Sequence, residues 1–183
     1  MDVKRMKVVV VALVLVAIAL VFVLRDREPP ADMPEGGVLE EEMGRGIQSV
    51  TLVFADRAAT GMVEERRELA VPEDRAGRAK RILSELAAGP TQSGVRTLPQ
   101  GTRVLSVFFD EQGGVFVDLS RELVDNHPGG STGELFTIRS VVQTLAANFP
   151  DIESVRFLVE GEEVETIAGH IDASVPFLVG HYR

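Results

Sequence analysis

The sequence predicts an α+β fold, a small two-layer sandwich in which two helices cover one face of a mixed sheet, preceded by one transmembrane helix. Several short segments alternate apolar and polar residues, which is the pattern of half-buried strands. Two longer segments repeat apolar residues every three or four positions, as amphipathic helices do. Residues 8–24, VVVVALVLVAIALVFVL, form an unbroken apolar run. The apolar stripes of both helices need a surface to cover, and one apolar face of a small sheet supplies it.

Residues 8–24 predict a transmembrane signal anchor within residues 1–27. A helix over this run is about 25 Å long, slightly less than the roughly 30 Å core of a bilayer, and Lys7 and Arg25 can reach the interfaces from its ends. A cleaved signal peptide is the alternative, but no small-residue cleavage site separates the run from the charged residues that follow it. Cationic residues before the run predict a cytoplasmic N-terminus and a C-terminal part outside the inner membrane.

The charge and the cysteine content exclude several classes of function. Without the N-terminal Asp2, Lys4, Arg5 and Lys7, the chain keeps 16 basic and 27 acidic residues, a net charge of −11. Such a field repels phosphate backbones, so we expect no nucleic-acid partner. The chain has no cysteine, which excludes disulfides, thiolate metal sites, a cysteine nucleophile and a lipidated cysteine.

Residues 28–46, EPPADMPEGGVLEEEMGRG, predict a flexible acidic linker, because they are rich in Pro, Gly and Glu and lack hydrophobic periodicity. Residues 47–183 are expected to form one extracytoplasmic domain. Its first predicted strand is QSVTLVF, residues 48–54, in which every second residue from Val50 to Phe54 is apolar. Residues 62–71 are its predicted partner, and their central run of charged residues is typical of an edge strand that avoids pairing with other chains.

The first helix of the domain is predicted to begin at Pro72, because the fixed φ of proline suits a first helical position. Glu73 and Asp74 complement the positive end of the helix dipole. Gly89 and Pro90 are expected to end the helix. Its apolar stripe consists of Ala79, Ile82, Leu83 and Leu86.

A β-hairpin is predicted next, from residues 103–109 and 114–120 joined by the tight turn DEQGG. In its first strand the expected core-facing residues are Leu105, Val107 and Phe109. In its second strand Asp118 lies on the face opposite Val115, Val117 and Leu119, so we expect Asp118 to face solvent or to bond a turn.

A second helix is predicted over residues 131–149 and ends at Pro150. Its apolar stripe consists of Leu135, Ile138, Val142, Leu145 and Phe149. A further strand is predicted over residues 155–159. The turn EGEE, which contains Gly161, then leads into a short return strand over residues 164–167.

The stretch GGSTGELF, residues 129–136, fits two patterns. Gly129, Ser131 and Gly133 have the G-x-S-x-G spacing of a hydrolase nucleophile elbow. Ser131 and Glu134 have the S-x-x-E spacing of a helix capping box. An elbow requires a strand that runs directly into the serine turn, whereas DNHPGG before Ser131 is typical of a loop. We therefore expect Ser131 and Glu134 to cap the second helix, with anion binding at its N-terminus as a third alternative.

The remaining candidates for metal binding are histidines near acidic residues. His127 lies close to Asp125, and His170 and Asp172 form an isolated H-x-D. A metal site needs three or four converging ligands, so loop capping is the expected role of His170 and Asp172. We assign no catalytic, cofactor-binding or metal-binding residue.

Four stretches of the predicted domain together resemble the GerMN domain, the sporulation and spore germination GerM-type domain. They are LSELAAGP (83–90), PQGTRVLSVFFDEQGGVFVDLS (99–120), GELFTIRSVVQTLAANFPDIESVRFLVEG (133–161) and GHIDASVPF (169–177). The resemblance implies an αββαβ core similar to the ring-building motifs of spore-channel and secretion assemblies, without catalytic residues. The chain departs from common family arrangements in lacking a lipidation cysteine and in carrying one copy of the domain where some relatives carry two.

The sequence and the resemblance together predict a non-enzymatic, membrane-anchored interaction or assembly module of the cell envelope, of the sporulation and germination type. Its expected partners are other envelope proteins or further copies of itself. A module that binds cell-wall glycan or another small envelope ligand is the alternative, and it needs a concave site. A serine hydrolase that uses Ser131 is the remote alternative, and it needs an acid and a histidine within hydrogen-bond reach of Ser131.

Overall fold

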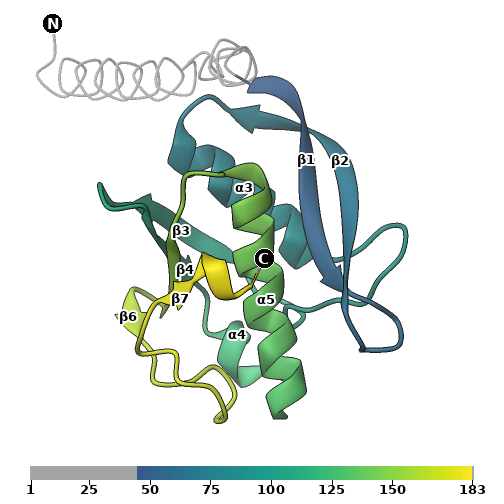
Figure 1. Ribbon diagram of the computed structural model, residues 1–183, viewed down its shortest axis with the longest axis vertical. Helices are drawn as coiled ribbons and strands as arrows, with labels where there is room; N and C mark the ends of the chain where they lie inside the picture. Colours follow the sequence, from purple (N-terminus) through teal and green to yellow (C-terminus); the bar gives the residue numbers. More distant parts are fainter. Residues whose placement is uncertain (1–44, 183) are drawn as a thin grey trace, which may run out of the picture. The chain divides into compact units, whose positions relative to one another are not determined.

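The computed structural model describes the backbone of residues 45–182 and the side chains of residues 46–182 (Figure 1). The predicted anchor and nearly all of the predicted linker lie outside the described residues. Among the described residues, no helix is both long enough and apolar enough to cross a membrane. The elements, in chain order, are β1 (Arg45–Ala55), β2 (Met62–Pro72), α3 (Arg75–Ala88), β3 (Val104–Phe109), β4 (Gly114–Leu119), α4 (Glu122–Asp125), α5 (Ser131–Asn148), β5 (Ser154–Val159), β6 (Glu162–Glu163), β7 (Phe177–Leu178) and the 3-10 helix η1 (Val179–His181).

The main sheet is mixed, as predicted. Its strand order is β3-β4-β5-β6, and β7 also pairs with β5. β3 and β4 are antiparallel, whereas β4 and β5 are parallel. The chain between the two parallel strands contains α4 and α5, because parallel strands need a crossover connection. β6 and β7 run antiparallel to β5 at its two ends.

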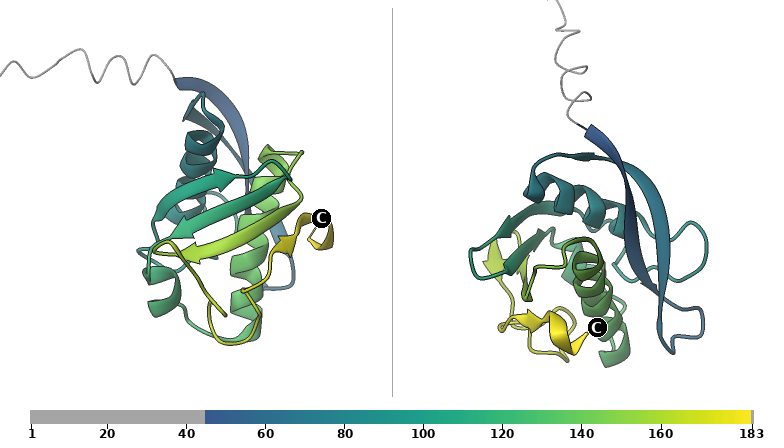
Figure 2. Two further views of the ribbon diagram at one scale, coloured as in Figure 1. Left: turned by 90° about the vertical axis from the view of Figure 1, so that its left-hand side faces the viewer. Right: turned by 45° about the horizontal axis from the view of Figure 1, so that its top comes forward.

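The strands β1 and β2 form a separate two-stranded sheet, with a regular register from Arg45 opposite Pro72 to Ala55 opposite Met62. β1 begins at Arg45, two residues before the expected domain start. Figures 1 and 2 show α3 and α5 between this hairpin and the main sheet. Two helices do cover one face of the main sheet, but the prediction of only two layers is wrong, because the hairpin covers the other side of the helices.

The helix α3 begins later than predicted. Pro72 is the last residue of β2, and Asp74 is the N-cap, with its carboxylate accepting a hydrogen bond from the amide of Gly77 at 2.6 Å. The predicted apolar stripe is confirmed, since all four of its residues are buried. Gly89 ends the helix with φ of 95°, a conformation that favours glycine.

The helix α5 is buried on more sides than an amphipathic surface helix. Its N-terminal half departs from the predicted stripe, because Leu135 is 36% exposed while the neighbouring Glu134 is fully buried. On the side facing the hairpin, Thr144 Oγ1 accepts from the amide of Val53 at 2.9 Å, and Asn148 bonds both backbone groups of Thr51. Polar residues on this side of α5 are therefore partners of the β1 backbone, which hydrophobic periodicity cannot reveal.

Two strand predictions are corrected in detail. In β3 a register shift between Val104 and Ser106 breaks the simple alternation. As a result Val104 and Val107 are buried, whereas Leu105 is only half-buried. The predicted return strand over residues 164–167 is absent, and the two-residue β6 takes its place immediately after the turn. Ile167 is nevertheless fully buried, because the loop that carries it folds back onto α5.

Candidate interaction surfaces

The segment before α5 has neither the elbow nor the capping box. Gly129 and Gly130 have φ of 83° and 82°, and they follow α4 and a loop instead of a strand. Gly130 is the N-cap, and no side chain caps the helix. Ser131 is exposed, so the predicted pairing of Ser131 with Glu134 is wrong. The physical reason is that Glu134 binds a different set of backbone amides, which come much later in the chain.

Glu134 is a fully buried carboxylate that holds a loop. Its Oε1 accepts from the amides of Ile167 and Ala168, both at 2.9 Å, and its Oε2 accepts from those of His170 and Ile171 at 2.9 and 3.1 Å. Burial by itself would raise the pKa of Glu134, but these four hydrogen bonds outweigh burial and lower it. We call this arrangement the Glu134 clamp, and it fixes the loop between β6 and β7.

The two candidate histidines have structural partners. The Nδ1 of His127 accepts from the amide of Gly129 at 3.0 Å, so its Nε2 carries the proton and donates to Thr137 Oγ1 at 3.0 Å. Thr137 in turn donates to the carbonyl of Thr97 at 2.6 Å. Burial lowers the pKa of His127, while the nearby Glu134 opposes that shift. His127 is thus a neutral link between α4, α5 and the segment before β3.

His170 and Asp172 serve the same clamped loop. The amide of His170 bonds Glu134, and its ring Nδ1 lies 3.5 Å from Glu134 Oε2. Asp172 accepts from the amide and the hydroxyl of Ser174, and these bonds lower the pKa of Asp172. Within residues 46–182 no group of three or more His, Asp or Glu side chains is placed to hold a metal ion, and neither histidine is hydrogen-bonded to Ser131.

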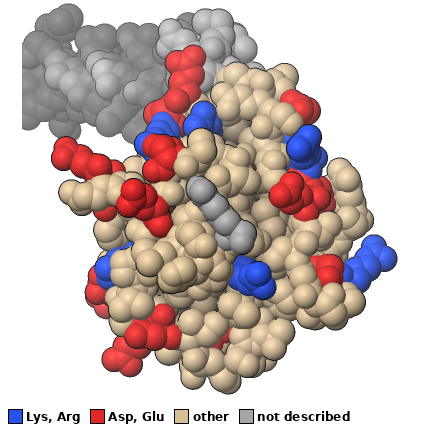
Figure 3. All heavy atoms as spheres, viewed as in Figure 1, with Lys and Arg blue, Asp and Glu red and all other residues tan. Residues whose placement is uncertain are grey.

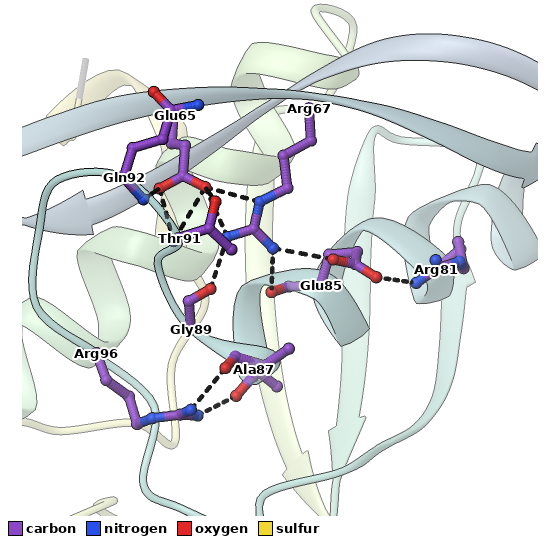
Figure 4. Close-up of polar contacts among 10 residues, drawn as sticks. Glu65, Arg67, Arg81, Glu85, Ala87, Gly89, Thr91, Gln92 and Arg96 are labelled. Carbon is purple, nitrogen blue, oxygen red and sulfur yellow. Dashed lines mark hydrogen bonds and ion pairs between the residues drawn. The ribbon is translucent and has the colours of Figure 1, made fainter.

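A second buried carboxylate, Glu65 on β2, fixes the chain after α3 (Figure 4). It accepts from the hydroxyl of Thr91 at 2.6 Å and from the amides of Thr91 and Gln92. Arg67 pairs with Glu65 at 2.7 Å and with Glu85 of α3 at 2.9 Å. Burial would raise the pKa of Glu65, but the hydrogen bonds lower it to about 2. We call this network the Glu65 clamp.

The remaining predicted motif residues shape turns. The carbonyl of Gly89 accepts from Arg67 at 2.6 Å, and a Cβ at Gly89 would lie 2.9 Å from the Arg96 guanidinium. Pro90 follows in the loop of the Glu65 clamp. Asp118 accepts from the amide of Gly161 at 2.8 Å, which confirms its turn-bonding role. Gly161, with φ of 84°, forms the turn between β5 and β6.

One face of the main sheet is not covered by any described element (Figure 2, left). This face carries exposed and half-buried apolar side chains. Phe108 on β3 is 58% exposed and lies opposite the half-buried Phe116 of β4. Phe116 lies opposite Arg156 of β5, whose guanidinium is 6.0 Å from the Phe116 ring centroid. The half-buried Leu158 continues the same face. We call these four residues the Phe108 surface.

A groove of about 370 Å³ lies between the hairpin, α5 and η1. Most of its wall is apolar, with Glu64, Gln143 and Tyr182 as the polar exceptions; the other lining residues are Val53, Met62, Val142, Ala146, Ala147 and Val179. On the face that Figure 3 shows, acidic and basic side chains are scattered over the upper part and the sides, one basic side chain lies near the middle, and the lower part is mostly uncharged. The sequence pattern did not predict this groove, because its walls come from three segments distant in the chain.

Comparison with known proteins finds a matching protein family and similar solved structures. A family model described as Germane, sporulation and spore germination, matches residues 51–165. Among solved structures, a candidate lipoprotein from Clostridium perfringens is 24% identical, with a TM-score of 0.51 over 74% of this chain and 89% of that one. The first GerMN domain of the sporulation protein GerM from Bacillus subtilis is 22% identical, with a TM-score of 0.52 over 70% of this chain and 97% of that domain.

The tandem GerMN domains of the same Bacillus subtilis protein are also 22% identical, with a TM-score of 0.54 over 72% of this chain. This chain covers 46% of that tandem structure, so it spans about half the length of the tandem arrangement. No curated protein matches the chain. The structural likenesses establish the fold, and the family model extends over more than half of the sequence. The chain therefore belongs to the sporulation and spore germination family of GerMN domain proteins.

Proposed function

We propose that this protein is a non-enzymatic interaction module of the bacterial cell envelope, anchored in the cytoplasmic membrane by residues 8–24. The observation that carries the proposal is the Phe108 surface, because an uncovered sheet face with a 58% exposed phenylalanine is a feature of binding surfaces. The GerMN relatives support an extracytoplasmic position, since one is described as a candidate lipoprotein and another as a sporulation protein.

The polar chemistry of the domain supports binding over catalysis. The two buried carboxylates are saturated by hydrogen bonds from the chain itself, through the Glu134 clamp and the Glu65 clamp. His127 uses both ring nitrogens in structural bonds. A catalytic group needs a free hydrogen-bond donor or acceptor that faces a substrate. The hydrogen-bonding groups of these residues are already bonded to loops of the chain itself.

Site-specific photocrosslinking in living cells tests the proposal. A photoreactive residue at Phe108 of the full chain is expected to capture a specific envelope protein or a second copy. Val175 is a matched control, because it is 51% exposed but lies outside the Phe108 surface. Absence of a product at position 108, or the same products at positions 108 and 175, would contradict the proposal.

A small-ligand function is the second candidate, and the groove beside α5 favours it. The mostly apolar wall fits an acyl chain or another amphipathic envelope molecule better than a sugar chain, because few polar groups converge there. Ala146→Trp would fill the groove. A rise in melting temperature with lipid-linked wall precursors or wall fragments that disappears in this variant would support the function, and no rise with any of them would exclude it.

The serine hydrolase alternative has a direct test in the same protein. Fluorophosphonate probes label an activated serine, whereas an ordinary exposed hydroxyl does not react. We expect no labelling of the full chain. Labelling that is lost in Ser131→Ala would overturn the non-enzymatic proposal.

A further inference from the structure

The outer edge of the hairpin can be located from the bonds on its inner edge. Thr51 of β1 donates its amide to Asn148 Oδ1 at 3.1 Å, and its carbonyl accepts from Asn148 Nδ2 at 2.7 Å. Both backbone groups of Thr51 therefore point away from β2. Arg66 lies directly opposite Thr51, so its amide and carbonyl must point to the other side, away from β1.

The regular register extends this conclusion along β2. Backbone direction alternates with a period of two, and the pairing of β1 with β2 has no shift. The amides and carbonyls of Glu64, Arg66, Glu68 and Ala70 thus face outward together. Among residues 46–182, none of these eight groups has a hydrogen-bond partner.

The two edges of the hairpin differ in the hydrogen-bond partners of their backbone groups. From Thr51 to Ala55 the inner edge of β1 is closed by Asn148 and Thr144 of α5 and by a backbone bond from Val95 to Ala55. The edge of β2 lies on the outer side of the hairpin, away from α5 (Figure 1). An open edge of this length is a template for strand addition.

The side chains along this edge decide which strand fits. Glu64, Arg66 and Glu68 are exposed on the outer face of the hairpin, and none forms an ion pair among the described residues. Two antiparallel copies of β2 in the register Arg66 opposite Arg66 would set like charges against each other. A shift of two residues sets Arg66 opposite Glu68 twice, once on each side of the two-fold axis.

We propose that β2 pairs antiparallel with β2 of a second copy in this shifted register, which joins two hairpins into one four-stranded sheet. Arg67 lies beside the two-fold axis, but its charge is already neutralised by Glu65 and Glu85 of its own copy. The shifted register also places Glu64 opposite Ala70. Such pairing is isologous, so it closes as a dimer and leaves both edges of β2 occupied.

This pairing deepens the proposed function by naming one partner, a second copy, and it rests on that function. It uses a surface separate from the Phe108 surface, so the two can be tested apart. With the photoreactive residue placed at Leu158 of the Phe108 surface, Phe108→Ser is expected to abolish capture of the envelope partner and to leave the dimer intact. Loss of one result without the other shows which proposal has failed.

Cysteine crosslinking in the full chain tests the register, because the natural chain has no cysteine. We would coexpress a Glu64→Cys copy and an Ala70→Cys copy with different tags and oxidise the membranes. Directly opposite residues are about 5.5 Å apart between Cα atoms, which suits a disulfide. A heterodisulfide is the expected product. Two Glu64→Cys copies should not crosslink, because six residues along the strand separate these positions by about 20 Å.

No heterodisulfide, or equal crosslinking of Glu64→Cys with itself, would overturn the proposed register.

Charge reversal gives the second test on the purified full chain. Arg66→Glu replaces two attractive pairs with two repulsive ones, so the dimer dissociation constant should rise about tenfold or more. The double variant R66E/E68R should restore it. Arg57→Glu, which changes an exposed residue of the hairpin turn, is the matched control and should have no effect. Failure of the double variant to restore pairing contradicts the proposal. The proposal is also contradicted if β2 pairs only with strands of other proteins and never with a second copy.

Discussion

The Glu134 clamp and the Glu65 clamp solve the same problem with different partners. Both bury a carboxylate, and both use it to hold a loop that follows a regular element. Glu65 has a guanidinium at 2.7 Å in addition to backbone amides, whereas Glu134 relies on four backbone amides and has only the exposed His170 ring nearby at 3.5 Å. The comparison teaches that oriented amides alone can stabilise a buried charge, so a buried acid in this fold can hold a loop even without an arginine or lysine partner.

Glu134→Ala is expected to have the largest effect. The substitution leaves four amides of the loop without their acceptor, and the neighbouring chain offers no second one. We expect a loss of about 4 kcal/mol in the free energy of unfolding, measured by chemical denaturation. Leu135→Ala is the matched control, because Leu135 is 36% exposed, and it should cost well under half as much. An equal loss in both variants would show that the clamp adds nothing to ordinary helix packing.

The Glu65 clamp predicts a dependence of stability on pH. The pKa of Glu65 is about 2 in the folded chain against an ordinary value of 4.5, so its contribution is present above pH 4.5 and is lost as the pH falls toward 2. The shift corresponds to about 3 kcal/mol. The contribution of Glu134 to stability is also lost as the pH falls, because its pKa is lowered as well.

The contribution of Glu65 can be separated by comparing Glu65→Gln with the unchanged chain. Chemical denaturation at about pH 5 and about pH 2 should give a smaller loss of unfolding free energy in the variant. If the variant and the unchanged chain lose the same amount, the folded pKa of Glu65 is not lowered and the comparison of the two clamps is incorrect.

Much of the fold could be predicted from the sequence, whereas the clamps could not. Periodicity located the helix that ends at Gly89, the hairpin partners β1 and β2, and the buried face of β4, because each pattern is local. Glu134 bonds amides that lie 33 to 37 residues further along the chain, and Glu65 bonds Thr91, 26 residues away. Spacing within a helix therefore suggested a cap at Ser131 and Glu134, because it could not reveal these distant competitors.

The position of the hairpin was missed for a related reason. The side chains that bind β1 are Thr144 and Asn148, which are polar residues on a helix predicted by its apolar stripe. Their role depends on the approach of β1, some 90 residues earlier in the chain. A sequence pattern shows which face of a helix is apolar. It does not show which polar side chains bond the edge of a strand in place of a neighbouring strand.

The link through His127 should be weaker than either clamp, because it involves no charge. Thr137→Val removes the donor to the Thr97 carbonyl and the acceptor of the His127 ring proton while keeping the side-chain shape. We expect a loss of about 2 kcal/mol in unfolding free energy. Nitrogen NMR should find the Nε2–H tautomer of neutral His127 in the unchanged chain. The Nδ1–H tautomer there would contradict the assigned direction of these bonds.

Asp118 gives the smallest expected effect and isolates the role of burial. It accepts a 2.8 Å bond from the Gly161 amide, comparable in length to the bonds of Glu134, but it does so at an exposed turn. Water can replace the lost acceptor there, so Asp118→Ala should cost about 1 kcal/mol, and Asp118→Asn less, because its amide oxygen can still accept. A loss in Asp118→Ala as large as that in Glu134→Ala would mean that the number and burial of unsatisfied amides do not set the strength of a clamp. The ratio of the two losses, measured under one condition, is therefore the sharpest test of why Glu134 is buried while Asp118 is not.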